Sequence, residues 1–224
     1  MHSTIFERMV GLASDIRAEF TNSCGEPLVS KDLSRFPWQN DIFRSKAFRR
    51  GHLEVLDVRD TKKMWIMHVC IFPHLDDSSP IFGFDVICGA NKITGVFLDF
   101  SITGDKDHPM VHWFRDRVKD VSWKKDRELP DWGKAIFSPY MIAAGNVNTD
   151  EELEKIIVIA KECLSYYIAN VGNTIHNTSF CNEHNFYCKK QKENQHTPRF
   201  LINCGVSEGD AMHFMHKHLF PEVA

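Results

Sequence analysis

The chain has 224 residues, of which 25% are charged and 43% are hydrophobic, and its formal net charge is −3. This length and composition suit one large globular domain or two small ones, and we expect a single domain spanning residues 1–224. The near-neutral charge excludes a strong global field for nucleic acid. Since no apolar run approaches membrane-spanning length, we also expect no membrane partner.

Cysteine usage points to a reducing compartment. The seven cysteines are an odd number, are scattered along the chain and form no CxxC pair. Secreted domains stapled by disulfides usually carry an even number of cysteines in a regular framework. The acidic residues of the first segment, Glu7, Asp15 and Glu19, do not fit a signal or transit peptide. We therefore expect a reduced, cytoplasmic protein.

The predicted secondary structure is a run of strands between helices. An amphipathic helix over residues 3–20 comes first, and glycine and proline residues make the segment over 21–50 irregular. Apolar alternation then predicts strands, which cover residues 52–58, 64–72, 81–88, 93–100 and, less regularly, 136–144. Further helices are predicted over residues 149–171, 180–192 and 207–219. Short connections favour an antiparallel meander, so the fold class is α+β, with one sheet covered on both faces.

The stretch PIFGFDVICG places one carboxyl, Asp85, among apolar strand residues. A charge in a buried strand is costly unless a partner pairs with it. A tight first hairpin puts Glu54 opposite His68, and pairing Phe72 with Ile81 puts His68 opposite Asp85. We therefore predict that Glu54, His68 and Asp85 form a row across three neighbouring strands, which we call the polar row.

Other polar residues are expected near the polar row. His52 lies two residues before the glutamate and shares its face, and Thr94 and Val96 are predicted to face the row from the fourth strand. A slip of one residue in register would scatter the set. Carboxyls and imidazoles on an apolar face form a coupled proton site that can donate protons near neutral pH. The alternative is a satisfied structural network inside the sheet.

Several common kinds of site are missing from the sequence. It has no GxGxxG after a strand, no Walker motif, no iron–sulfur spacing and no GxSxG nucleophile elbow. The segment CNEHNFYC offers Cys181, His184 and Cys188, but their spacing is not a standard zinc pattern. We interpret the three histidines near the C-terminus, His213, His216 and His218, as a polar helix face. No metal site is therefore predicted.

From about Phe48 to its end, the chain resembles the ferredoxin-dependent bilin reductases, closest to their phycocyanobilin-forming branch. The motifs that carry the resemblance occur in the family's order and read FRRGHLEV, HVCIFP, PIFGFDVICG, RELPDWGKAIFSPY, NQHTPRFL and HKHLFP. The resemblance implies a three-layer α/β/α sandwich with a central antiparallel sheet. It also implies a monomer that reduces biliverdin IXα in single-electron steps, through bilin radicals. The electrons come from reduced ferredoxin, and no cofactor is bound permanently.

The resemblance also implies roles for residues. The polar row matches the family's proton-supplying glutamate, histidine and aspartate, and Arg127 matches an arginine that contacts a substrate propionate. A guanidinium fork suits a carboxylate. The remaining residues that we expect to bind substrate are His52, Thr94, Asn194, His196 and Arg199.

The chain departs from the family pattern in ways that affect the predicted product. Gln195 replaces an aspartate, His196 stands where a lysine is expected, and the first hairpin is two residues longer. The retained Glu54 favours phycocyanobilin as the product, and the isomer phycoerythrobilin, made by phage-derived relatives, is the alternative. A non-catalytic bilin carrier is a rival from another class, whereas a hydrolase would need a nucleophile that the sequence does not offer.

Two basic clusters fit an acidic ferredoxin partner. They comprise Arg44, Lys46, Arg49 and Arg50 in the first cluster and Lys189, Lys190 and Lys192 in the second. Electrostatic complementarity would speed the encounter of the two proteins. Taken alone, each cluster is more typical of an ordinary solvated face than of a docking surface.

Overall fold

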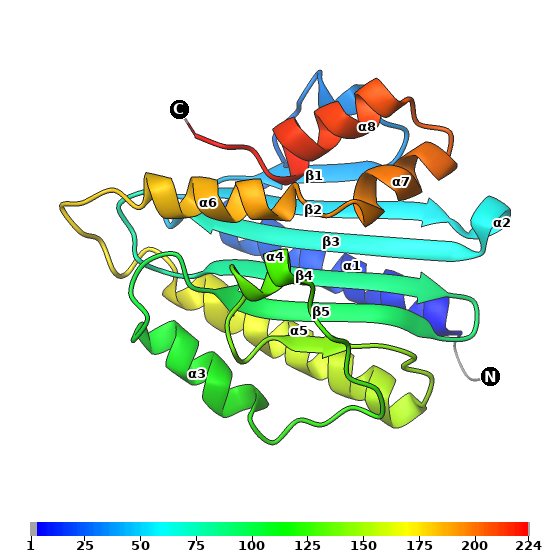
Figure 1. Cartoon of the computed structure of the whole chain (residues 1–224), viewed down its shortest axis with the longest axis horizontal. Coiled ribbons are helices and arrows are strands. Elements are labelled where there is room, and N and C mark those ends of the chain that lie inside the picture. Colours follow the sequence, from blue (N-terminus) through cyan, green and yellow to red (C-terminus); the bar gives the residue numbers. More distant parts are fainter. Residues whose placement is uncertain (1–3, 224) are drawn as a thin grey trace.

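The computed structural model describes residues 4–223 and contains a six-stranded antiparallel sheet in the order β1-β2-β3-β4-β5-β6 (Figure 1). Each strand pairs with its neighbour in sequence, so the predicted meander is confirmed. The strands are β1 (Gln39–Phe43), β2 (Phe48–Val58), β3 (Met64–Pro73), β4 (Ile81–Gly89), β5 (Ile93–Ser101) and β6 (Ile142–Ala144). The turn between β2 and β3 is a single helical turn, α2 (Arg59–Lys62), and it leaves Val58 paired with Met64 as expected.

The edges of the sheet differ from the predictions. β1 lies inside the segment predicted to be irregular, because its sequence QNDIF has no apolar alternation and forms an edge strand with polar, partly exposed residues. The last strand, β6, contains only three of the nine residues predicted over 136–144. The residues just before that predicted segment form the short helix α4 (Asp131–Lys134), which was not predicted.

One layer of helices lies behind the sheet and comprises α1 (Ile5–Cys24), α3 (Pro109–Val118) and α5 (Asp150–Asn170) (Figure 1). The hydroxyl of Thr4 caps α1 in a capping box with Glu7, and Thr149 caps α5. The apolar faces of these helices pack on the rear-facing side chains of every strand from β2 to β5, forming the larger core. The first and the fifth helix were predicted, although residue 3 of the first prediction lies outside the described residues, whereas α3 was missed.

A second layer lies in front of the sheet and comprises α4, α6 (Cys181–Gln191), α7 (His196–Asn203), α8 (Glu208–Phe214) and the π-helical turn η2 (Met215–Leu219) (Figure 1). A 3-10 turn, η1 (Leu33–Arg35), packs beside them. α6 matches its prediction, and the last predicted helix is found as α8 followed by η2. The protein is therefore an α+β sandwich of three layers, and no helix within residues 4–223 combines the length and apolar character that a bilayer span requires.

Candidate active site

The predicted register of the polar row is confirmed. Glu54 of β2 pairs with His68 of β3, and His68 pairs with Asp85 of β4. All three side chains therefore lie on the front face of the sheet, since residues opposite one another in neighbouring strands point to the same side. The register holds because the alternating residues of β2 to β4 fill the rear core, and a slip of one position would turn these apolar side chains outward.

The polar row runs from buried to open. Glu54 is 6% exposed and His68 is 9% exposed, whereas the side chain of Asp85 is 41% exposed. His68 Nδ1 donates to Asp85 Oδ1 across 2.6 Å. The imidazole of His68 thus lies between a buried carboxyl, Glu54, and a partly exposed carboxyl, Asp85.

Burial controls the proton affinity of Glu54. Removing this carboxyl from water raises its pKa to about 7, although the neighbouring His68 and the hydrogen bond from Trp38 both act to lower it. Trp38 Nε1 donates to Glu54 Oε1 across 2.8 Å. Near neutral pH this carboxyl therefore exists as a mixture of its acid and its anion, which suits a group that donates a proton.

The pKa values of His68 and His52 are shifted in opposite directions. Burial alone would lower the pKa of His68, but the charge and hydrogen bond of Asp85, together with Glu54, raise it above its ordinary value. Burial and the nearby Arg50 lower the pKa of His52 well below its ordinary value. His52 Nε2 donates to Asn40 Oδ1 at 3.1 Å, so the neutral imidazole carries its proton on Nε2. The site therefore places an imidazole that binds a proton more readily than usual beside one that binds it less readily, with ring centroids 5.9 Å apart.

In β5, the fourth strand of the predicted meander, one residue faces the other side of the sheet from the side predicted. Val96 packs in the rear core, so the expectation that it faces the polar row is wrong. Phe97 pairs with Asp85 instead, because a register shift between Ile87 and Cys88 inserts Thr94 as an extra residue in β5. Thr94 Oγ1 donates to the carbonyl oxygen of Ile87 at 3.1 Å.

Arg127 lies at the front face, in the segment before α4. Its guanidinium carbon sits 5.6 Å from the ring centroid of Phe97, the residue paired with Asp85. Gly95 leaves space for it, since a Cβ at that position would come within 2.7 Å of Arg127 Nη1. Arg127 is exposed, and none of residues 4–223 forms an ion pair with it. A free guanidinium beside an aromatic ring can bind a carboxylate.

The remaining predicted residues cluster around the start of α7 and bond locally. Asn194 Oδ1 accepts from the backbone N–H of His196 at 2.9 Å, and Arg199 Nη2 donates to Gln195 Oε1 at 2.8 Å. Within the described part of the chain, these residues form no hydrogen bond to the polar row. Sequence reasoning also missed two residues of this site. Trp38, just before β1, bonds to Glu54, and Asn40 of β1 bonds to His52. Their only signal would have been the edge strand itself.

The front face is partly open over β4 and β5. Gly83, Asp85 and Ile87 are half-buried, whereas the alternate residues of β4 are buried in the rear core. A surface hollow lined by Val10 and Trp65 lies on the rear side, and no member of the polar row lines it. The partly exposed front face is thus the surface on which a flat, apolar ligand with carboxylates could contact the row.

Comparison with known proteins decides the family. The family model described as ferredoxin-dependent bilin reductase matches residues 8–221. The chain belongs to this family. The reductase is 27% identical over 207 residues to a phycocyanobilin:ferredoxin oxidoreductase of Prochlorococcus marinus, covering 88% of this chain and 81% of that protein. It is 28% identical over 176 residues to the enzyme of the same name from a Synechococcus species, covering 72% of this chain and 67% of that protein.

Solved structures agree with this assignment. A structure of PcyX superposes with a TM-score of 0.68 at 29% identity, covering 95% of this reductase and 98% of that chain. Phytochromobilin synthase from tomato, solved in complex with biliverdin, superposes with a TM-score of 0.74 at 15% identity and covers 94% and 82%. The second likeness supports the fold alone.

The family depends on ferredoxin, but the predicted basic surface is smaller than the sequence implied. Arg49 and Arg50 turn inward: the guanidinium of Arg49 stacks 4.7 Å from the Phe72 ring, and Arg50 donates to the carbonyl oxygen of His218 at 2.7 Å. The prediction that they face a partner is therefore wrong, and only Arg44 and Lys46 of the first cluster are exposed. In the second cluster each lysine is paired: Lys189 and Lys192 with Glu222, and Lys190 with Glu193.

Proposed function

We propose that the protein reduces biliverdin IXα to a phycobilin, with four electrons from reduced ferredoxin and four protons that pass through the polar row. Ferredoxin supplies one electron at a time, so each step places negative charge on the bilin. An adjacent acid that gives up a proton as this charge appears removes the cost of holding it in an apolar site. The observation that supports the proposal is the convergence of Glu54, His68 and Asp85 on the partly open face.

Each member of the polar row has a distinct part in this proposal. Asp85 meets the open face and would pass the first proton to the bilin after taking it from His68. His68, whose pKa is raised by the charge and hydrogen bond of Asp85, delivers that proton to the carboxylate. Glu54, whose pKa is raised to about 7, supplies a second proton near neutral pH. Because the three groups interact strongly, their protons titrate as a set.

Other side chains would hold the substrate. Arg127 binds one propionate through its free guanidinium, and His52 keeps its neutral imidazole beside the row. Thr94, together with Asn194, His196 and Arg199 at the start of α7, completes the predicted binding set. The last three would contact the bilin from the front layer, to which α7 belongs (Figure 1).

We favour phycocyanobilin as the product, because Glu54 is present in the row with a carboxyl that is protonated in part near pH 7. Phycoerythrobilin, an isomer at the same reduction level, is the alternative. The decisive assay incubates the purified chain without oxygen, with biliverdin IXα, ferredoxin, ferredoxin reductase and NADPH, and separates the products by chromatography against both standards. A bound-bilin spectrum with no reduction would make the protein a carrier and overturn the proposal.

A further inference from the structure

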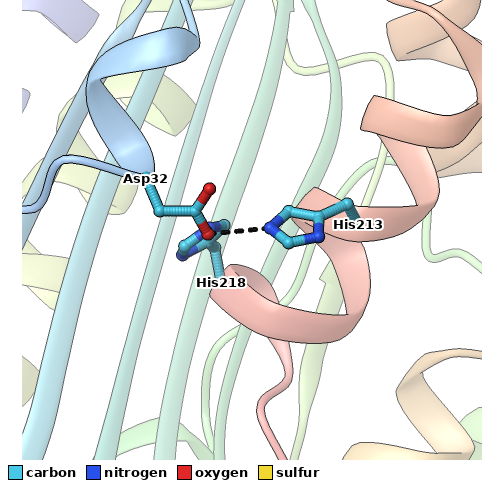
Figure 2. Close-up of side chains that lie close together, drawn as sticks. All are labelled: Asp32, His213 and His218. Carbon is cyan, nitrogen blue, oxygen red and sulfur yellow. Dashed lines mark hydrogen bonds and ion pairs between the residues drawn. The ribbon is translucent and has the colours of Figure 1, made fainter.

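Two histidines and one aspartate meet at a single point away from the polar row. His213 Nε2 and His218 Nε2 lie 2.7 and 2.8 Å from the same oxygen of Asp32, Oδ2. Figure 2 shows both imidazoles turned toward this carboxylate from the C-terminal helical segment. Among residues 4–223 it is the one set of three such side chains whose ligand atoms all lie within 4.8 Å of one another. The interpretation of His213 and His218 as a plain polar helix face is therefore wrong.

The local backbone is what brings the two histidines together. Residues five apart lie on different faces of a regular α-helix, whose turn has 3.6 residues. Here α8 passes into the π-helical turn η2, in which the Phe220 N–H bonds to the carbonyl oxygen of Met215, five residues back. This widened turn lets His218 come over the same side as His213. Such π turns are rare and are often found at functional sites.

We propose that Asp32, His213 and His218 form a binding site for a divalent transition-metal ion of the zinc type. Two imidazole nitrogens and one carboxylate oxygen are the ligand set of three-ligand zinc sites that keep a position open for water. Zinc–ligand bonds of about 2.0–2.2 Å place neighbouring ligands roughly 3.3 Å apart in a tetrahedron. The observed separations of 2.7 and 2.8 Å need only a small outward movement of each side chain. The ion would take Nε2 of each imidazole, whose proton then moves to Nδ1 or to water.

Neighbouring charged groups hold the Asp32 carboxylate in position. The other oxygen of Asp32, Oδ1, faces Arg35 Nη1 at 3.5 Å, and Arg35 also pairs with Asp210. Arg35 can thus orient the aspartate while leaving Oδ2 free for an ion, as outer partners commonly do for metal ligands. Asp32, Asp210 and Arg35 together carry a net charge of −1, and the Arg50 guanidinium, which donates to the carbonyl oxygen of His218, adds one positive charge beside them.

The site is both reachable and anchored. The side chains of Asp32 and His213 are 44% and 35% exposed, so an ion can enter from solvent, whereas that of His218 is 9% exposed. The ion would tie the segment before η1 to the C-terminal helices.

The test uses the full chain without a histidine tag, stripped of metal with chelator and dialysed against Zn²⁺. We expect one zinc ion per chain. Asp32→Asn and His213→Gln, both at half-exposed positions, should each weaken zinc binding by about tenfold or more, since even outer-partner changes cost about 10- to 100-fold. Both substitutions keep a polar side chain of similar shape, and circular dichroism confirms that each variant folds. Co²⁺ added in place of zinc should give the visible absorption of a tetrahedral site.

Matched controls separate this site from other zinc ligands. His216→Gln removes a histidine of the same helical turn that lies outside the set, and Cys181→Ser removes a half-buried thiol. Both controls should bind zinc like the parent. Failure of the parent to bind zinc, or binding that Asp32→Asn and His213→Gln leave unchanged, would overturn the site. Loss of binding in the Cys181→Ser control would do the same, by placing the ion on α6.

Discussion

Replacing Glu54 by glutamine tests the proton affinity on which the candidate active site depends. The carboxyl is 6% exposed and accepts a hydrogen bond from Trp38 Nε1 at 2.8 Å. Glutamine keeps the shape and the accepting oxygen but cannot titrate. Any difference between the parent and Glu54→Gln that changes with pH therefore reports the titration of this one group and of groups coupled to it.

The raised pKa of Glu54 determines how the free energy of unfolding changes with pH. Burial raises the pKa of Glu54 from 4.5 to about 7 on folding. Below the unfolded pKa the carboxyl is protonated in both states, so burial carries no charge penalty. As pH rises, the unfolded chain loses the proton first, and the free energy of unfolding falls until the folded pKa is passed. At 1.36 kcal/mol per pKa unit this loss totals about 3 kcal/mol, and most of it falls between about pH 5 and pH 8.

The measurement is urea unfolding of both proteins at intervals across this range. The advantage of Glu54→Gln over the parent should grow by about 2–3 kcal/mol from about pH 5 to pH 8. A difference that stays flat over the range would mean that the buried carboxyl ionises like an exposed one. The proposed proton donation by Glu54 near neutral pH would then have no basis.

Three further predictions concern the same face. Asp85→Asn removes the charge that holds a proton on His68, so turnover should fall by about 10²–10⁴-fold, with biliverdin still bound and a long-lived radical signal in electron paramagnetic resonance. Arg127→Ala removes a charge-assisted hydrogen bond of about 1.5–3 kcal/mol, so biliverdin should bind roughly 10- to 100-fold more weakly by absorbance titration, with kcat changed little. Trp38→Phe removes the donor that stabilises ionised Glu54, so the pH-dependent fall in unfolding free energy should extend to higher pH.

Each of these predictions has an outcome that contradicts it. Normal product formation by Asp85→Asn would remove that residue from the proton path. Arg115→Ala is the control for Arg127→Ala, because Arg115 pairs with Asp116 away from the front face and its loss should leave binding unchanged. Equal weakening in both variants would argue for a general charge effect. An unchanged pH profile in Trp38→Phe would show that the hydrogen bond does not tune the carboxyl.

The polar row could be predicted because sheet register is a matter of counting. The short connection between β2 and β3 limits which of their residues can face each other, and the set of apolar residues that fill the rear core favours the observed register. The same counting failed at Val96, since the extra residue Thr94 in β5 is a bulge that no simple alternation reveals. Capped helices such as α5 could also be predicted, because the capping residue Thr149 and the apolar periodicity are signals in the local sequence.

Features that depend on distant contacts were not predictable. β1 is polar and becomes a strand only because β2 offers it an edge, so Trp38 and its bond to Glu54 were missed. The meeting of Asp32 with His213 and His218 joins residues more than 180 positions apart and needs a π turn, which helical periodicity does not foresee. The inward turn of Arg49 and Arg50 likewise reflects packing against Phe72 and the C-terminal turn, not local sequence.

The difference in exposure between Asp85 and Glu54 bears on how the polar row would take up new protons. A reduction that consumes four protons in each turnover empties any single acid, so the acids must be refilled from water. Asp85, with its side chain 41% exposed, meets solvent, whereas Glu54 is enclosed and reaches Asp85 only through His68. Bound bilin would cover Asp85 and close that route while the substrate is present. A proton stored on His68, whose pKa is raised by its contact with Asp85, and another on Glu54, whose pKa is about 7, would then be the reserve available behind the substrate. The buried members of the row thus explain why three acid–base groups, and not one exposed carboxylate, stand on this face.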